Sequence, residues 1–341
     1  MHPCGRAWCV CAIICVPLLG FHAVYSRPIG GATSEEPAQD PGLLLDGDVT
    51  GKRMPAIGFG TCCRASAKGP PLIASALEYL AQGGRLIDTA QMYENHEDLK
   101  VAIQRSRVPR DQLWITSKVM TIRGQLSSGS LKGGALKAAT LSQVSLILTE
   151  LGVEYVDLML LHHAKNNGPE ERAAQWKGLL AAKERGQIKH AGVSNFDREQ
   201  IEALKASTGV MPAANQLEYH PYVSDETHGL VQWCQQQGIA ITAYGSLGSS
   251  STGGKAGDGV ASVARRHGVT STAVLLRWAL SKGCAIIPGS GSATHIFQNL
   301  HIKLFELTAE DEASIRGKPP PHSWRMWNNM AKADGSPLKP R

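Results

Sequence analysis

Four side chains in the first half of the chain have the residue types needed to move a proton. Asp88 and Tyr93 lie five residues apart, and Lys118 and His162 follow further along. A free phenol has a pKa near ~10, so at neutral pH it is a slow proton donor or acceptor. A buried ammonium lowers that pKa by stabilising the phenolate, but it needs a carboxylate partner of its own. We therefore expect Lys118 to pair with Asp88 and to lower the pKa of Tyr93.

Each of these groups stands at the end of a short apolar run or just after it, and such runs recur along the chain. Later runs lead to Ser194-Asn195, Gln216, Tyr244 and Ser290. Helical patterns lie between the runs, so strand and helix alternate about eight times, which is typical of a parallel sheet buried on both faces. The sequence thus predicts a closed (β/α)8 TIM barrel. The carboxyl ends of its strands meet at one mouth, where the polar groups would line a single site.

Cap and turn residues predict where several helices begin and end. Asp197 is a predicted N-cap, because its carboxylate can accept a hydrogen bond from an early backbone N–H. Gly168-Pro169 opens a helix that Gly186 closes. Further helices are predicted over residues 71–81, 96–106, 136–151, 270–282 and 294–299. Residues 121–134 form a loop rich in Gly and Ser that exceeds the usual strand-to-helix length, so we expect it to be functional or mobile.

Six short motifs occur in order between about residues 50 and 300. They are Met54-Pro55-Ala56-Ile57-Gly58-Phe59-Gly60-Thr61, Ile87-Asp88-Thr89-Ala90 with Tyr93 and Asn95, Thr116-Ser117-Lys118, Asp157-Leu158-Met159-Leu160-Leu161-His162, Gly192-Val193-Ser194-Asn195-Phe196, and Asn215-Gln216-Leu217-Glu218-Tyr219-His220-Pro221-Tyr222. In this order they resemble the aldo-keto reductase family. The resemblance implies one reductase barrel over residues 51–318. It also implies an NAD(P)H-dependent oxidoreductase that reduces a small aldehyde or ketone to an alcohol.

The resemblance gives each of the first four side chains a catalytic role. Carbonyl reduction needs a hydride donor on one face of the substrate and a proton donor near its oxygen. Tyr93 is the expected proton donor, with Lys118 and Asp88 in support, and His162 would orient or polarise the carbonyl oxygen. His162 taken alone would be interpreted as a core histidine, and only the order of all four residues favours a function.

Side chains at the later strand ends have groups that suit a nicotinamide cofactor. Ser194, Asn195 and Gln216 offer donors and acceptors for a carboxamide, and Tyr244 offers a ring for a planar heterocycle. Within the resemblance these positions hold and stack the nicotinamide. The run Gly245-Ser246-Leu247 opens a glycine-rich stretch that matches the loop over the cofactor's pyrophosphate. Its Gly and Lys spacing is not that of a P-loop, and a solvated connector is the alternative.

The expected phosphate end of the cofactor site departs from the family. Ser290 and the N-terminus of the next helix would receive phosphate through unpaired N–H groups, and Gln298 and Asn299 would contact the adenosine. Where the family commonly has a lysine and an arginine, this chain has Gly289 and His295. Two charge-assisted contacts, each typically about 1.5 to 3 kcal/mol, are therefore missing or weakened. The resemblance implies NADP(H), with NAD(H) as the alternative, and we expect only a small preference for NADPH.

The expected substrate region is also altered. At three places where the family commonly has tryptophans, the aligned residues are Cys62, Met120 and His163. A less aromatic region favours a roomier or more polar carbonyl substrate. The tail, residues 319–341, contains Trp324 and Trp327 and either covers the mouth or packs elsewhere.

Two other classes of protein stay open on the sequence alone. One is a cofactor-bound barrel that serves as a regulatory or interaction subunit, although such a role would not need the full catalytic set. The other is an unrelated barrel hydrolase that uses paired carboxylates or a metal. Neither a second carboxylate at a strand end nor a cluster of metal ligands is visible, and the adjacent Cys62 and Cys63 lack the spacing of a zinc or redox motif. We therefore expect no metal and no disulfide framework.

The net charge and the N-terminal residues limit which partners and which compartment we expect. The net charge is +6, but Lys and Arg are spread along the chain, so we expect no nucleic-acid site. Residues 1–26 resemble a secretory signal peptide or targeting leader, and residues 27–50 a disordered linker. A membrane anchor, or a mis-assigned start ahead of a cytoplasmic enzyme, is the alternative. We expect a monomer in the secretory pathway or an organelle, with no stable membrane span after the leader is removed.

Overall fold

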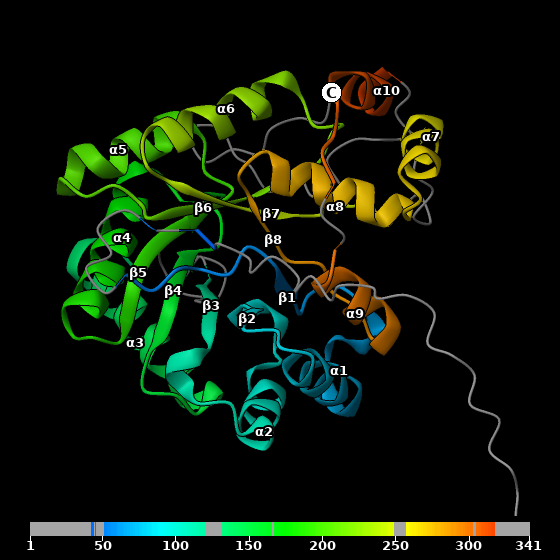
Figure 1. The fold of residues 1–341 in the computed structure, drawn as a ribbon. Helices are drawn as coiled ribbons and strands as arrows, with labels where there is room; N and C mark the ends of the chain where they lie inside the picture. The colour runs from blue at the N-terminus through cyan, green and yellow to red at the C-terminus, as the bar shows by residue number, and fades with distance from the viewer. Residues whose placement is uncertain are drawn as a thin grey trace, which may run out of the picture. The chain divides into compact units, whose positions relative to one another are not determined.

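Figure 1 shows the fold in a computed structural model of the chain. The structure describes residues 42, 43, 45, 51–120, 131–165, 167–248, 257–302 and 305–317. The predicted leader, most of the linker, the tail and residues 121–130 of the predicted long loop lie outside the described residues. No helix within these described ranges is long and apolar enough to cross a membrane.

Eight parallel strands form one sheet in which each strand pairs with the next in sequence order. The sheet closes on itself: Ile57 bridges to Ile286, and the Ile286 N–H donates to the Ala56 carbonyl at 2.8 Å. The predicted (β/α)8 barrel is confirmed. The strands are β1 Gly58–Gly60, β2 Leu86–Asp88, β3 Trp114–Val119, β4 Val156–Leu161, β5 Ile188–Ser194, β6 Ala214–Glu218, β7 Ala240–Tyr244 and β8 Ala285–Ile286.

Helices follow the strands and lie around the sheet (Figure 1). Asp197 caps its helix as predicted, accepting from the Gln200 N–H at 2.8 Å while Gln200 accepts from the Asp197 N–H. The other predicted helices agree with the structure to within about three residues at each end. The α-helices are α1 Gly69–Ala81, α2 His96–Ser106, α3 Gly133–Leu151, α4 Pro169–Glu184, α5 Arg198–Thr208, α6 Asp225–Gln236, α7 Asp258–His267, α8 Ser271–Ser281, α9 Ala293–Leu300 and α10 Ala309–Gly317, with short 3-10 turns η1 Ala65–Ala67, η2 Gln91–Tyr93 and η3 Arg110–Gln112.

The two faces of the strands bury different apolar clusters. Ile87 and Ile115 pack in the large cluster that includes helix residues such as Leu72, whereas Leu86 and Trp114 belong to a second cluster. Successive side chains of a strand point to opposite faces. The Leu86 face therefore lines the barrel interior, and the next inward positions on β2 and β3 are polar. Because side chains alternate along a strand, Asp88 and Lys118 point into the barrel interior near the carboxyl ends of β2 and β3.

Part of the predicted linker takes part in the fold. Leu43 pairs with Met54 in an antiparallel bridge, with N–H···O distances of 2.7 and 2.8 Å. Leu45 is buried and packs with Met54 in the cluster that contains Trp114. Within residues 27–50, predicted to be a disordered linker, Leu43 and Leu45 thus make contacts with the barrel, because their apolar side chains can pack against it.

Candidate active site

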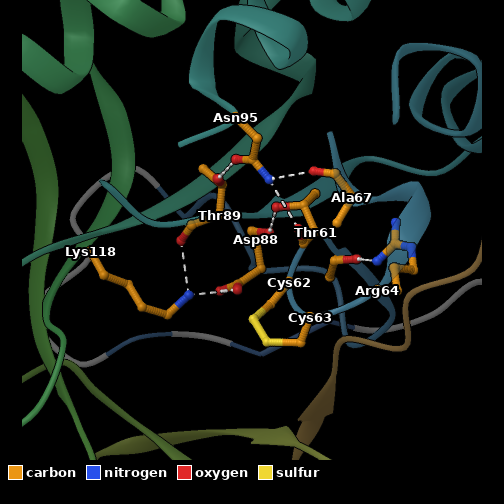
Figure 2. Close-up of a disulfide and its surroundings, with 10 residues drawn as sticks. Thr61, Cys62, Cys63, Arg64, Ala67, Asp88, Thr89, Asn95 and Lys118 are labelled. Carbon is orange, nitrogen blue, oxygen red and sulfur yellow. Dashed lines mark hydrogen bonds and ion pairs between the residues drawn. A yellow bond between two sulfur atoms is a disulfide. The ribbon is translucent and has the colours of Figure 1, made fainter. Parts of the chain in front are cut away.

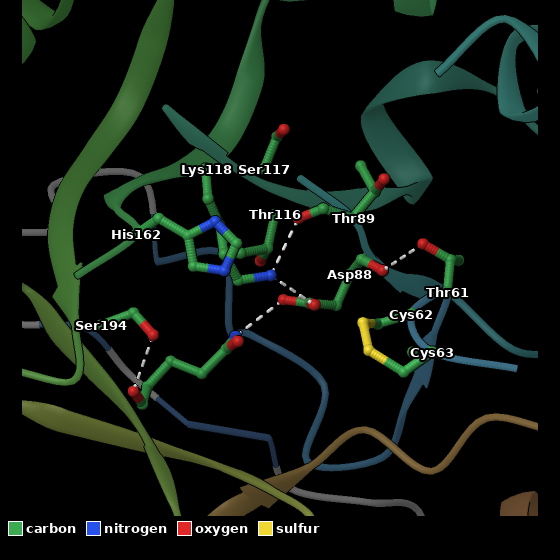
Figure 3. A network of polar contacts seen from close by, with 12 residues as sticks. Thr61, Cys62, Cys63, Asp88, Thr89, Thr116, Ser117, Lys118, His162 and Ser194 are labelled. Atoms are coloured by element: carbon green, nitrogen blue, oxygen red, sulfur yellow. Dashed lines mark hydrogen bonds and ion pairs between the residues drawn. A yellow bond between two sulfur atoms is a disulfide. The ribbon is translucent and has the colours of Figure 1, made fainter. Parts of the chain in front are cut away.

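A buried ion pair lies at the centre of the site. The Lys118 Nζ donates to the Asp88 carboxylate at 2.6 Å and to the Thr89 carbonyl at 2.8 Å (Figure 3). Both charged side chains are almost fully buried. Burial alone would lower the pKa of the Lys118 ammonium, but attraction to Asp88 and Tyr93 outweighs it and raises the pKa. The predicted pairing of Lys118 with Asp88 is present, and it keeps the ammonium charged.

Tyr93 follows β2 in the turn η2 and lies beside this pair. The Lys118 Nζ is 5.1 Å from the centre of the Tyr93 ring. Burial has the largest effect and raises the pKa of Tyr93; the charge and hydrogen bond of Lys118 lower it, and Asp88 raises it further. The expectation of a lowered pKa is wrong in its net sign, although Lys118 acts in the expected direction. The phenol is therefore protonated at neutral pH.

His162 directly follows β4 and faces Tyr93. The two rings are 5.7 Å apart and nearly perpendicular. Burial, followed by repulsion from Lys118 and His163, holds the pKa of His162 well below its usual 6.5. Its buried Nδ1 has no hydrogen-bond partner within the described part of the chain. The side chain is therefore a neutral imidazole, whose single N–H can donate to a carbonyl oxygen.

A polar network behind Asp88 fixes the loop that follows β1. The Thr61 hydroxyl donates to the Asp88 carbonyl at 2.9 Å, and the Asn95 amide donates to the carbonyls of Thr61 and Ala67 at 2.9 and 3.1 Å (Figure 2). The Thr89 hydroxyl donates to the Asn95 side-chain oxygen at 2.7 Å. Thr61 and Asn95 stand in the sequence motifs, but no role was predicted for them, because a motif does not show which polar side chains are buried.

The predicted nicotinamide residues form one hydrogen-bonded group at the ends of β5, β6 and β7. The Ser194 hydroxyl donates to the Gln216 carbonyl at 2.9 Å, and the Asn195 amide donates to the Ser194 hydroxyl and the His162 carbonyl at 2.9 and 3.0 Å. The Tyr244 hydroxyl donates to the Asn195 side-chain oxygen at 2.7 Å. The structure thus brings these residues together beside His162. That they contact a cofactor stays a prediction.

A side-chain amide joins this group to the ion pair. The Gln216 Nε2 donates to the second oxygen of Asp88 at 2.7 Å, between residues 128 apart in sequence. Asp88 therefore receives Lys118 on one oxygen and Gln216 on the other. Gln216 was predicted only as a nicotinamide contact, and this second contact depends on two strands that meet only in the closed barrel.

The run after β7 lies next to this group. Gly245 has a φ of +62°, a conformation that favours glycine. The Ser246 hydroxyl donates to the Ala243 carbonyl at 3.1 Å, and the Leu247 side chain is exposed. Residues 249–256 of the predicted pyrophosphate loop lie outside the described residues.

The predicted phosphate end lies at the start of α9. The helix is capped by Ser292, whose hydroxyl accepts from the His295 N–H at 3.4 Å. Ser290 stands two residues before that cap and accepts from the Ser292 N–H at 3.0 Å. His295 and Gln298 are exposed. Asn299 is half-buried and lines a small cavity together with Ser290.

The three predicted substrate residues are half-buried. The His163 ring lies 5.8 Å from the ring of His162. The structure joins Cys62 and Cys63 in a disulfide in the loop after β1, close to Asp88 (Figures 2 and 3). The sequence predicted no disulfide framework, and this single bond between neighbouring residues does not form one. Among the described residues, no group of His, Cys, Asp and Glu could hold a metal ion.

Comparisons with known proteins agree with the fold and with the family resemblance of the sequence motifs. Residues 57–318 match the model of the aldo/keto reductase family. A methylglyoxal reductase of Escherichia coli O157:H7 is 34% identical, over 77% of this chain and 92% of its own length. A crystal structure of an aldo/keto reductase from Brucella melitensis superposes with a TM-score of 0.68 at 29% identity, over 81% of this chain and 98% of that one. A Bombyx mori aldo-keto reductase in complex with NADP gives a TM-score of 0.70 at 25% identity, over 82% and 92%.

Proposed function

The chain belongs to the aldo/keto reductase family, and from that premise we propose that it reduces a small aldehyde or ketone to an alcohol with NADPH, using Tyr93 as the proton donor. The observation that carries the proposal is the placement of Tyr93 against the buried pair of Lys118 and Asp88, with a neutral His162 facing it.

Tyr93 is suited to give a proton to a carbonyl oxygen. Its raised pKa keeps the phenol protonated at neutral pH, so the donor form is the resting form. When the proton leaves, the phenolate lies beside the Lys118 ammonium, which stabilises the new negative charge. Asp88 balances that ammonium throughout. Lys118 and Asp88 thus lower the free-energy cost of deprotonating Tyr93 during the reaction, while the phenol stays protonated before it.

His162 is suited to orient the substrate oxygen. As a neutral imidazole it can donate one N–H to a carbonyl oxygen without adding a charge near Lys118. Its buried Nδ1 has no partner among the described side chains and carbonyls, so no contact of that nitrogen with them fixes which ring nitrogen carries the proton. Its edge-on position against Tyr93 would let both side chains donate a hydrogen bond to the same substrate carbonyl oxygen.

The residues beside this set fit a nicotinamide cofactor. When bound, the nicotinamide supplies the hydride for the reduction. Ser194, Asn195 and Gln216 present hydroxyl and amide groups at adjacent strand ends, and each oxygen has a second lone pair to offer a carboxamide. The complex of the Bombyx mori relative with NADP supports NADP(H) as the cofactor.

Replacing Tyr93 by Phe tests the proton donor. We expect Tyr93→Phe to lower kcat for aldehyde reduction by about 10²- to 10⁴-fold, the usual contribution of general acid catalysis, while Kd for NADPH changes little. The measurement is NADPH oxidation with a panel of aldehydes and ketones, methylglyoxal included, next to a fluorescence titration with NADPH. Tyr155→Phe is the matched control, because Tyr155 precedes the amino end of β4, far from the carboxyl end.

Two outcomes would argue against this function. Normal turnover by Tyr93→Phe would rule out Tyr93 as the donor. Tight NADPH binding by the unaltered chain without turnover of any carbonyl compound would instead favour a regulatory or interaction subunit built on the same barrel.

A further inference from the structure

An arginine from the loop after β1 lies against the loop between β8 and α9. Arg64 donates from Nη1 to the Gly60 carbonyl at 2.7 Å and from Nε to the Ser66 hydroxyl at 3.1 Å. Its guanidinium carbon lies 5.1 Å from the centre of the Phe59 ring. These contacts hold the guanidinium at the rim of the barrel, where β1 and β8 close the sheet (Figure 2).

Two glycines of the β8–α9 loop make room for this side chain and its partner. A Cβ at Gly289 would overlap the Arg64 guanidinium and would lie 2.5 Å from the Gly60 carbonyl oxygen. A Cβ at Gly291 would lie 2.7 Å from the Ser66 hydroxyl oxygen. Any side chain at position 289 would therefore compete with Arg64 for the same space. Gly289 and Arg64 thus depend on each other, although they come from opposite ends of the barrel sequence.

The guanidinium keeps an unused donor. Its Nη2 is covered by surrounding atoms yet has no hydrogen-bond partner within the described part of the chain. Burial lowers the pKa of Arg64 to about 10, which still leaves it charged at neutral pH. A buried guanidinium N–H without an acceptor is unfavourable. An anion at this corner would supply the acceptor, once the flexible end of the side chain turns toward it.

We propose that Arg64 determines selectivity for the 2′-phosphorylated dinucleotide by donating to its 2′-phosphate at the corner formed with Ser66 and Ser290. The proposal rests on the function proposed above, since it concerns the cofactor of the same site. Guanidinium groups match the geometry of phosphate and form strong charge-assisted hydrogen bonds with it. Arg64 would then provide the positive charge that Gly289 and His295 do not. The preference for NADPH should accordingly be larger than the sequence alone led us to expect.

Binding measurements with Arg64→Met test this assignment. The full chain, Arg64→Met, Arg64→Lys and Lys68→Met are titrated with NADPH and with NADH by fluorescence. We expect Arg64→Met to weaken NADPH binding by about 10- to 100-fold, the usual loss for a hydrogen bond to a charged group, and to leave NADH binding within about twofold. Arg64→Lys should recover part of the loss. Lys68→Met removes an exposed cation near the same loop, one that pairs with Glu94, and should change neither.

A second set of ligands separates this proposal from the proposed function. Adenosine 2′,5′-bisphosphate and adenosine 5′-monophosphate carry no nicotinamide, so their binding does not depend on reductase chemistry. Calorimetry should show that Arg64→Met weakens the bisphosphate selectively, and that inorganic phosphate competes for the unaltered chain. Equal weakening of both nucleotides, or of NADPH and NADH alike, would assign Arg64 to another part of the cofactor and overturn the proposal. Unchanged binding of both would overturn it as well. If the unaltered chain reduced no carbonyl compound but Arg64→Met still weakened only the 2′-phosphorylated ligands, only the proposed function would be contradicted.

Discussion

Tyr93 shows how burial and charge compete at a single residue. Lys118 was expected to lower the pKa of Tyr93, and it does act in that direction. The phenol is nevertheless enclosed, and the cost of desolvating a phenolate exceeds the attraction to the ammonium. For the proposed role of Tyr93 as proton donor this outcome is favourable, because the phenol holds its proton until a substrate oxygen takes up charge.

The protonation states lead to an expected pH profile. The pKa of Tyr93 lies above its ordinary 10.0, and that of His162 well below 6.5. Between these values the phenol stays protonated and the imidazole neutral. We expect kcat/KM for carbonyl reduction to change little from about pH 7 to 9.5 and to fall above about pH 10, as Tyr93 loses its proton.

Steady-state kinetics across this range provides the measurement, with His162→Gln as the control. That variant should be slower at every pH but keep the fall above about pH 10, because the fall belongs to Tyr93. A fall centred between pH 7 and 8 in the unaltered chain would contradict the raised pKa of Tyr93.

At the scale of the elements, close helix contacts require particular glycines. Gly259 lies in α7 and is buried against α10, where a Cβ would overlap the carbonyl oxygen of Ser314. Backbone atoms cannot move aside as the end of a long side chain can. The residue type at 259 is therefore set by the approach of two helices that are separated by α8 and α9 in the sequence.

Alanine at position 259 should destabilise the fold. We expect Gly259→Ala to lower the free energy of unfolding by about 1 to 3 kcal/mol, since overpacking forces the two helices apart. Gly229→Ala is the matched control, because Gly229 lies within α6 and a Cβ there meets nothing within 4 Å. That change should stabilise by about 0.5 to 1 kcal/mol, the usual gain of alanine over glycine in a helix. Urea denaturation followed by circular dichroism compares the two, and equal effects would refute the close contact.

At the scale of the whole molecule, the site draws on every part of the barrel. Side chains from β2, β3, β4, β5, β6 and β7 meet at its carboxyl end, and the corner of Arg64 lies where β1 and β8 close the sheet. A cofactor held by these strand ends would bind the folded barrel and not the unfolded chain. Binding should therefore raise the stability of the barrel as a whole.

Thermal unfolding should reveal this linkage. At an NADPH concentration of about 100 times Kd, we expect a gain of roughly 2.7 kcal/mol in the free energy of unfolding and a higher Tm. Tyr93→Phe should show the same gain, because the proposed function assigns the Tyr93 hydroxyl to the substrate and not to the cofactor. Differential scanning fluorimetry measures both proteins. A Tm that does not move with NADPH would contradict cofactor binding by the folded barrel.

Much of the architecture follows from local patterns in the sequence. Apolar runs of strand length, helices with recognisable caps such as Asp197, and a polar residue at each strand end predicted the barrel and the meeting of Asp88, Tyr93, Lys118 and His162. These features could be predicted because periodicity, caps and turns depend on neighbours in the chain. The closing of a parallel barrel then carries the strand ends to one mouth.

Other features depend on contacts between segments that are remote in sequence. The sign of the pKa shift of Tyr93 depends on how completely the phenol is enclosed. The bond from Gln216 to Asp88 spans the barrel, and the fit of Arg64 against Gly289 joins its two ends. The burial of a side chain and its distance from residues remote in sequence are set when the strands and helices pack. Neither can be predicted from the pattern of residues along the chain. In the sequence, Gly289 indicated a missing cation. In the folded chain, the absence of a side chain at Gly289 leaves the space that the Arg64 guanidinium occupies.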